Sequence, residues 1–170
     1  MKKKMLIILL AIFTVISFLL TKNRIEILGI VSPSKSDVKK LYYANEMELN
    51  SICTFLQQEQ YTDIRIELLD TTKNMVCYYR NSKGGFDKLM IEFSDSNIIS
   101  DLEGLKKSGF IRIIKEYNYV FFQSWGSYGE SMGLMNSLGE KPNISKLNTV
   151  YTFMEKIEQT DWYCYKEKFE

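Results

Sequence analysis

Polar and apolar residues follow two different patterns along the chain, and the pattern changes near residue 36. The N-terminal part holds an uncharged apolar run of about 16 residues, from Met5 to Leu20, with three lysines before it and Lys22 and Arg24 after it. As a helix this run is about 24 Å long at about 1.5 Å per residue, against roughly 30 Å for a bilayer core. It has no polar face, unlike a soluble amphipathic helix. The run therefore predicts a membrane-targeting segment.

Two interpretations of this segment stay open, an uncleaved anchor and a cleaved secretory signal. A secretory signal ends in a small-x-small cleavage site, but the best match, at residues 15–17, lies inside the apolar run. The first cysteine is Cys53, so no cysteine follows the run closely enough for lipid attachment. These observations favour a single-pass anchor over residues 1–24. Since more basic residues precede the run than follow it, we expect a cytoplasmic N-terminus and a domain outside the membrane.

Residues 25–36 are predicted to be a linker, and residues 37–170 a single domain. Between Asp37 and Gln60 apolar residues recur at helical spacing, with Asn45 as the single polar interruption of the stripe. Ser36 or Asp37 is the expected N-terminal cap. The pattern predicts one long amphipathic helix that packs on an apolar surface.

After this helix the apolar period changes to two, which is typical of half-buried strands. Turn residues such as Gly84 and Gly85 separate the strand-like segments. Strands are predicted over residues 64–68, 74–80, 88–94, 110–115, 119–125, 132–138 and 162–166. Two short helices are expected, one over 98–107 with Gly109 as its C-terminal stop, and one over 150–158.

A long helix followed by successive hairpins predicts an α+β fold with a mainly antiparallel sheet. A sheet curved over that helix, cystatin-like in architecture, would suit this order of elements. The comparison concerns architecture alone and implies no activity.

Charge is distributed unevenly between the two parts of the chain. Five of the 22 basic residues lie within the first 24 positions, whereas all 21 acidic residues follow. The rest of the chain therefore carries 17 basic and 21 acidic groups, a net charge of −4. This balance excludes nucleic acid as the expected partner, because phosphates require a basic surface. Lysine far outnumbers arginine and Ile, Asn and Tyr are abundant, which is typical of proteins from low-GC bacteria.

Histidine is absent, which removes the most common general base and transition-metal ligand. The three cysteines, Cys53, Cys77 and Cys164, form no C-x-x-C pair, so neither a metal site nor a cofactor is expected. Three buried, unbridged cysteines are favoured. Cys77–Cys164 is the disulfide to expect if their strands are neighbours.

Residues 129–133 match G-x-S-x-G, the nucleophile elbow of α/β-hydrolases, with Ser131 at its centre. That motif functions on a strand–turn–helix with a histidine base. Here the local pattern is strand–turn–strand, so the match is interpreted as accidental. Two S-x-x-K matches, Ser32 to Lys35 and Ser36 to Lys39, lack their companion motifs and fit capping and linker roles.

The most site-like stretch runs from Phe121 to Gly129, where aromatic residues stand beside glycines. Rings can stack on sugars or peptides, and glycine allows close backbone approach. Trp125 and Tyr128 are therefore the candidate binding surface. The alternative is a strand that enters a Gly-rich turn with Trp125 on its core face, and this alternative is favoured.

Together these patterns predict a membrane-anchored, extracytoplasmic protein that is not an enzyme but a binding or inhibitory module. Its expected partners are the membrane, through the run from Met5 to Leu20, and a protein or other ligand at the cell surface. The alternative is a small hydrolase that uses two carboxylates or a Ser–Lys pair. The alternative location is secretion after signal cleavage.

Overall fold

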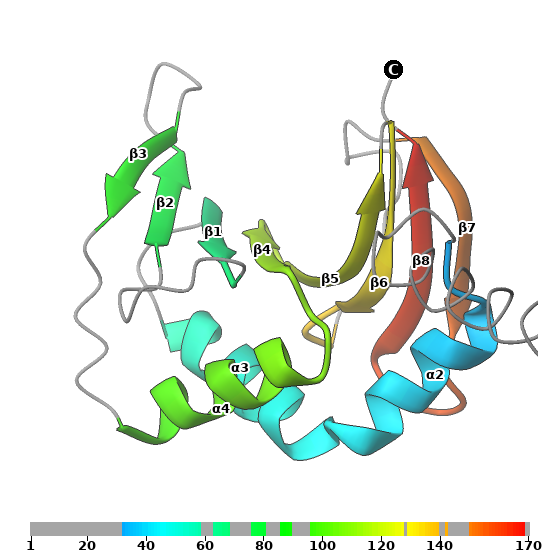
Figure 1. Cartoon of the computed structure of the whole chain (residues 1–170), viewed down its shortest axis with the longest axis horizontal. Helices are drawn as coiled ribbons and strands as arrows, with labels where there is room; N and C mark the ends of the chain where they lie inside the picture. Colours follow the sequence, from blue (N-terminus) through cyan, green and yellow to red (C-terminus); the bar gives the residue numbers. More distant parts are fainter. Residues whose placement is uncertain are drawn as a thin grey trace, which may run out of the picture. The chain divides into compact units, whose positions relative to one another are not determined.

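The computed structural model of the chain is shown in Figure 1. It describes residues 32–58, 63–68, 76–80, 86–89, 96–127, 129–139, 142 and 150–168. The folded unit is Pro33–Glu170. The run from Met5 to Leu20 lies outside the described residues. In the part of the chain that is described, no helix is long and apolar enough to cross a membrane.

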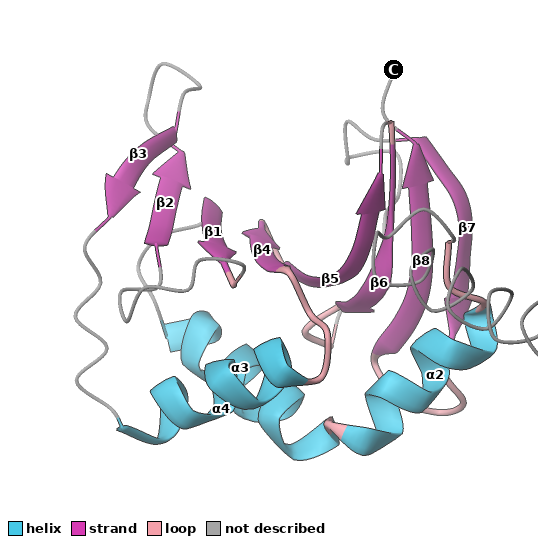
Figure 2. Cartoon of the chain, in the orientation of Figure 1, coloured by secondary structure: helices cyan, strands magenta, loops and turns pink. Residues whose placement is uncertain are grey.

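The unit is α+β, as the sequence predicts, with three described helices and eight described strands (Figure 2). The helices are α2 (Lys35–Ala44), α3 (Glu46–Gln58) and α4 (Ser96–Lys107). The strands are β1 (Asp63–Glu67), β2 (Val76–Arg80), β3 (Phe86–Leu89), β4 (Arg112–Glu116), β5 (Tyr119–Ser127), β6 (Glu130–Asn136), β7 (Val150–Lys156) and β8 (Trp162–Lys168).

The strands form a single sheet in the order β3-β2-β1-β4-β5-β6-β8-β7. Every strand pairing is antiparallel, which confirms the predicted sheet type. Most neighbours in the sheet are also neighbours in sequence. The described helices lie together on one side of the sheet (Figures 1 and 2).

The predicted long helix is wrong in one respect, because it is two helices that meet at Asn45. Asn45 ends α2 with φ −133° and ψ 23°, and only 5% of its surface is exposed. Its side-chain Nδ2 donates a hydrogen bond of 2.8 Å to the carbonyl oxygen of Leu41, and its Oδ1 accepts one of 2.5 Å from the Ser108 hydroxyl. The polar interruption of the stripe therefore marks the end of one helix and a tie to the end of α4.

The N-terminal cap of α2 is Ser34, earlier than the predicted Ser36 or Asp37. The Ser34 hydroxyl accepts a hydrogen bond from the Asp37 backbone N–H, and the Asp37 carboxylate accepts one from the Ser34 N–H, each 3.2 Å long. This reciprocal pair is a capping box. Asp37 thus contributes to the cap as its third helical residue.

The predicted helix over residues 150–158 is also wrong, since β7 occupies Val150–Lys156. A register shift between Tyr151 and Phe153 forms a bulge opposite β8. The bulge places Phe153 against the core between the helices and the sheet, and Met154 on the opposite face of the sheet. An apolar spacing interrupted by a bulge resembles helical spacing, and this accounts for the error.

Two predicted features at chain reversals are confirmed. Helix α4 stops at Gly109, whose φ is +98°, and the Phe110 N–H bonds to the Leu105 carbonyl at 3.0 Å. Strands β4 and β5 form the predicted hairpin, with Tyr117 at φ 52° in its turn. The end of α4 and the β4–β5 hairpin can therefore be predicted from local sequence.

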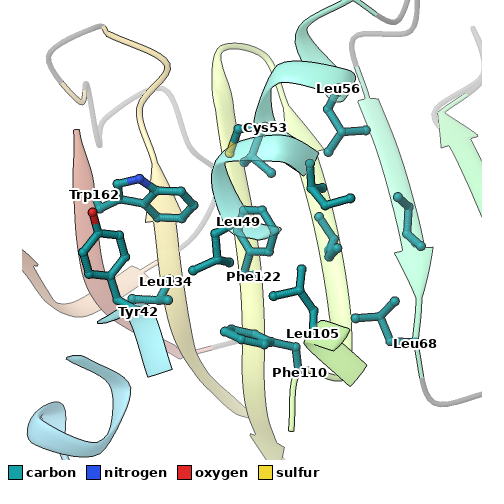
Figure 3. Close-up of a cluster of buried hydrophobic side chains, with 14 of the residues drawn as sticks. Tyr42, Leu49, Cys53, Leu56, Leu68, Leu105, Phe110, Phe122, Leu134 and Trp162 are labelled. Atoms are coloured by element: carbon teal, nitrogen blue, oxygen red, sulfur yellow. The ribbon is translucent and has the colours of Figure 1, made fainter. Parts of the chain in front are cut away.

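The main hydrophobic core lies between the helices and the sheet (Figure 3). Each helix contributes a buried stripe, such as Leu49 and Leu56 from α3 and Leu105 from α4. Phe122 and Leu134 face these helices from β5 and β6. Full burial of each such side chain contributes roughly 1.5–3 kcal/mol, so the helices depend on the sheet for their stability.

We predict that Asn45→Ala destabilises the unit by about 1–3 kcal/mol, because the substitution leaves the half-buried Ser108 hydroxyl without its acceptor and the Leu41 carbonyl without the donor that Asn45 supplies. Urea unfolding measures the change. Gln57→Ala, on the exposed face of α3, is the control and should change the free energy of unfolding by less than about 0.5 kcal/mol. Equal effects of the two substitutions would contradict the proposed role of Asn45.

Candidate functional site

The face of the sheet away from the helices carries a second cluster of buried side chains. Strand residues alternate between faces, so Phe122 points toward the helices while Phe121 points away from them. We name this group the second-face cluster. Its buried members and the half-buried residues packed on them are Tyr119, Phe121, Met135, Tyr165, Ile114, Tyr151, Met154 and Tyr163.

Three rings form the centre of the second-face cluster. Phe121 meets Tyr165 edge to face, with ring centroids 5.4 Å apart, and stacks nearly parallel to Tyr151 at 6.4 Å. Tyr151 and Tyr165 meet edge to face at 6.1 Å. Such pairs contribute about 0.5–1.5 kcal/mol each beyond their burial, so the rings link β5, β7 and β8.

A polar row crosses the same face from β1 to β5. Arg112 lies opposite Glu67 on one side and Gln123 on the other. Its Nε donates to the Glu67 carboxylate at 2.8 Å and its Nη1 donates to Gln123 Oε1 at 3.2 Å. Arg65 Nε donates to the same Glu67 oxygen at 2.5 Å. One carboxylate thus serves two guanidinium groups, which balances part of the positive charge on this half of the face.

Ser131 and Glu167 form a buried pair at the β6–β8 boundary. The two residues are register partners, Ser131 is fully buried, and Glu167 is 9% exposed. The Ser131 hydroxyl donates a hydrogen bond to the Glu167 carboxylate. Burial raises the pKa of Glu167 and Glu116 raises it further, whereas the Ser131 hydrogen bond and the charge of Arg112 lower it. This carboxyl is consequently easier to protonate than one on the surface.

The G-x-S-x-G match has the predicted strand–turn–strand structure. Gly129 lies in the turn with φ +78°, and Ser131 stands within β6. A nucleophile elbow exposes its serine at a strand-to-helix turn, whereas Ser131 has no exposed surface. Sequence reasoning recognised the motif as accidental but missed its link to Glu167, which lies 36 positions further along the chain.

Trp125, one of the two candidate binding residues, is buried in the core between helices and sheet, with 9% of its surface exposed. The Lys166 ammonium lies 5.9 Å from the centroid of its ring, and Lys166 also pairs with Glu130 at 2.8 Å. Tyr128, the other candidate, lies outside the described residues. The structure therefore places Trp125 where the core interpretation of this stretch requires it.

The condition set for a Cys77–Cys164 disulfide, neighbouring strands, is not met. Cys77 is in β2 and Cys164 in β8, and four strands stand between these two in the sheet. A disulfide requires Cα atoms within about 7 Å, and adjacent strands are already about 4.8 Å apart. Cys53 and Cys164 are buried free cysteines, and burial raises the pKa of the Cys164 thiol to about 11. Both thiols therefore stay protonated and inert at neutral pH.

Among the described residues no group of three or more Cys, Asp or Glu side chains could hold a metal ion. Comparison with known proteins finds no matching family model, no significantly similar curated protein and no significantly similar solved structure.

Gly133 provides a test of the packing on the second face. It stands opposite Gln123, beside the register shift between Gln123 and Trp125, and a Cβ atom there would overlap the carbonyl group of Phe122. We predict that Gly133→Ala destabilises the unit by more than about 2 kcal/mol, since the obstacle is backbone that cannot move aside. Thermal and urea unfolding measure the effect.

The control is Gly104→Ala in α4, where the nearest heavy atom would lie 3.8 Å from the new Cβ. Alanine is favoured over glycine inside a helix by about 0.8–1.0 kcal/mol, so this variant should be more stable than the wild type. If Gly133→Ala were as stable as Gly104→Ala, the described approach of β5 to β6 would be contradicted.

Proposed function

We propose that this chain is an N-terminally anchored, extracytoplasmic protein whose α+β domain is a non-catalytic binding or inhibitory module at the cell surface. The observation that carries the proposal is the uncharged run from Met5 to Leu20 with basic residues on both sides. In the proposal this run is a membrane helix. The folded unit begins at Pro33, which leaves residues 21–32 as a short tether.

The surroundings of Ser131 support binding over hydrolysis. Ser131 is fully buried and donates its hydrogen bond to Glu167, so a substrate cannot reach its hydroxyl in this arrangement. Lys166, the neighbour of Glu167 in sequence, interacts on the other face with Glu130 and Trp125. A Ser131–Lys166 pair would therefore require two residues on opposite faces of the sheet to meet.

The turn between β5 and β6 is the proposed contact region. Trp125 anchors the end of β5 in the core, and Tyr128 follows Ser127, the last residue of that strand. Strands that hold a turn in place on both sides are a usual support for binding residues. Tyr128 is accordingly the aromatic residue that we propose for partner contact.

We predict that the full-length protein, expressed in a bacterium with a C-terminal epitope tag, is recovered in the membrane fraction, and that protease added to spheroplasts removes the tag. The control is Leu10→Arg combined with Phe13→Arg. A charge at the centre of a membrane helix costs about 2.5–3.5 kcal/mol, so this variant should move to the soluble fraction.

Two outcomes would change the assignment. Recovery of the full-length wild type in the soluble cytoplasmic fraction would refute the anchor. Release of a shortened form into the medium would identify the segment as a cleaved secretory signal instead.

We predict different effects for the two aromatic candidates. Trp125→Ala should lower the free energy of unfolding by about 3–5 kcal/mol, because it empties a large buried site, whereas Tyr128→Ala should leave thermal unfolding unchanged. Pulldown from solubilised membranes with mass spectrometry of retained material measures binding, and Tyr128→Ala should reduce retention if the ring is a contact of about 2 kcal/mol.

Full retention of the partner by a stable Tyr128→Ala variant would exclude the turn as the binding site. Turnover of a glycan or peptide by the purified chain, lost on Glu167→Gln, would favour the hydrolase alternative.

A further inference from the structure

We propose that Glu167 is a proton-binding site of the folded domain. Its carboxyl group binds a proton when β6 and β8 pair and releases it as the surroundings become less acidic. The second face would then be a pH-sensitive element that is most stable in mild acid. This inference goes beyond the proposed function and holds whether or not the domain binds a partner.

Glu167 is enclosed within the sheet by the strands on both sides of β8. It stands in β8 between register partners on both sides, Ser131 of β6 and Tyr151 of β7. Its described hydrogen-bond partner is the Ser131 hydroxyl, a neutral donor. A buried carboxylate is costly unless it is paired with a cation, and among the described residues Glu167 has no ion pair. A bound proton removes this cost.

The charged groups around Glu167 do not form an ion pair with it among the described residues. Arg112 favours the ionised form of Glu167, but its guanidinium group already donates to Glu67 at 2.8 Å and to Gln123 at 3.2 Å. Glu116, also in β4, is a like charge that opposes ionisation of Glu167. Among the described residues, the charged or titratable groups coupled to Glu167 are Arg112 and Glu116 from β4, Tyr151 from β7 and Tyr165 from β8, and Tyr119 of β5 lies in the same cluster.

The tyrosines reinforce this preference for a neutral site. Burial raises the pKa of Tyr165 well above its usual value, and Glu167 raises it further, although Ser131 lowers it. Burial likewise raises the pKa of Tyr151, with Glu167 and Glu116 adding to the effect. These phenols therefore stay neutral throughout the range in which a carboxyl group titrates. They supply an apolar surrounding in which Arg112 is the positive charge that acts against protonation of Glu167.

The sign of the pH dependence follows from linkage. The folded chain raises the pKa of Glu167 above its usual 4.5, mainly through burial, so the folded state binds the proton more tightly than the unfolded chain does. The contribution to stability is fully present below pH 4.5 and is lost as the pH rises through the pKa of the folded state. Glu167→Gln, which mimics the protonated carboxyl, should remove this loss.

The experiment compares thermal unfolding of the full chain in detergent between pH 4.5 and pH 8 for wild type, Glu167→Gln and Glu130→Gln. Glu130 is the matched control, because it is also in the β6–β8 region but is paired with Lys166. The melting temperature of Glu167→Gln should equal that of the wild type at pH 4.5 and exceed it by several degrees at pH 8. Glu130→Gln should show no such gain.

A direct measurement accompanies the melts, in case the variant fails to fold. The carboxyl carbon resonance of Glu167 in the wild type, labelled at glutamate, should titrate with a midpoint above pH 4.5. Ser131→Ala removes the one hydrogen bond that favours the ionised form, so it should move this midpoint upward. A wild-type midpoint at or below pH 4.5, or parallel pH dependence of wild type and Glu167→Gln, would overturn the proposal.

Discussion

The fold depends on a central sheet whose middle strands are buried on both faces. Along β5, five successive residues from Tyr119 to Gln123 are buried, although neighbouring side chains point to opposite sides. Phe122 therefore packs under the helices while Phe121 joins a separate aromatic cluster. Every side chain of a strand that is buried on both faces must be apolar or have all its polar atoms hydrogen-bonded. The residues packed on each face of β5 meet this requirement in different ways.

On the helix side, the requirement is met by mixed aliphatic and aromatic packing with a few polar hydrogen bonds. Asn45 ends α2 and bonds to Ser108 after α4, and Ser51 of α3 donates to Asp101 of α4 at 2.5 Å. Lys115 of β4 is buried and donates to the Leu56 carbonyl near the end of α3. A lysine at the C-terminal end of a helix satisfies a free carbonyl and interacts favourably with the helix dipole.

On the other side, the requirement is met by rings and a polar network, and the two halves differ in charge balance. Toward β1, Glu67 accepts hydrogen bonds from the guanidinium groups of Arg65 and Arg112 and balances part of their positive charge. Toward β8, Glu167 has the Ser131 hydroxyl as its described hydrogen-bond partner. Networks with complete pairing rigidify a structure, whereas a carboxyl with a neutral partner responds to protonation. On this face Glu167 is thus the buried carboxyl whose protonation we expect to change with pH.

The sequence by itself determined the local features of this protein. The apolar periods identified the antiparallel strands and α4, and Gly109 marked the end of that helix. Asn45 was visible as an interruption, but only the tertiary structure showed a helix boundary, because its partner Ser108 is distant in sequence. The same holds for β7, since pairing with β8 overrides an apolar spacing that also fits a helix.

Even less of the candidate site could be predicted from the sequence. Ser131 belonged to a recognisable motif, yet its buried partner Glu167 carries no local signal, and neither does the placement of Tyr165 beside Tyr151. Cys77 and Cys164 looked equally suited to a disulfide until the strand order separated them. Local sequence determines period, caps and turns because these depend on residues a few positions apart. Only the tertiary structure decides which strands meet, because strand pairing depends on the burial of the whole chain.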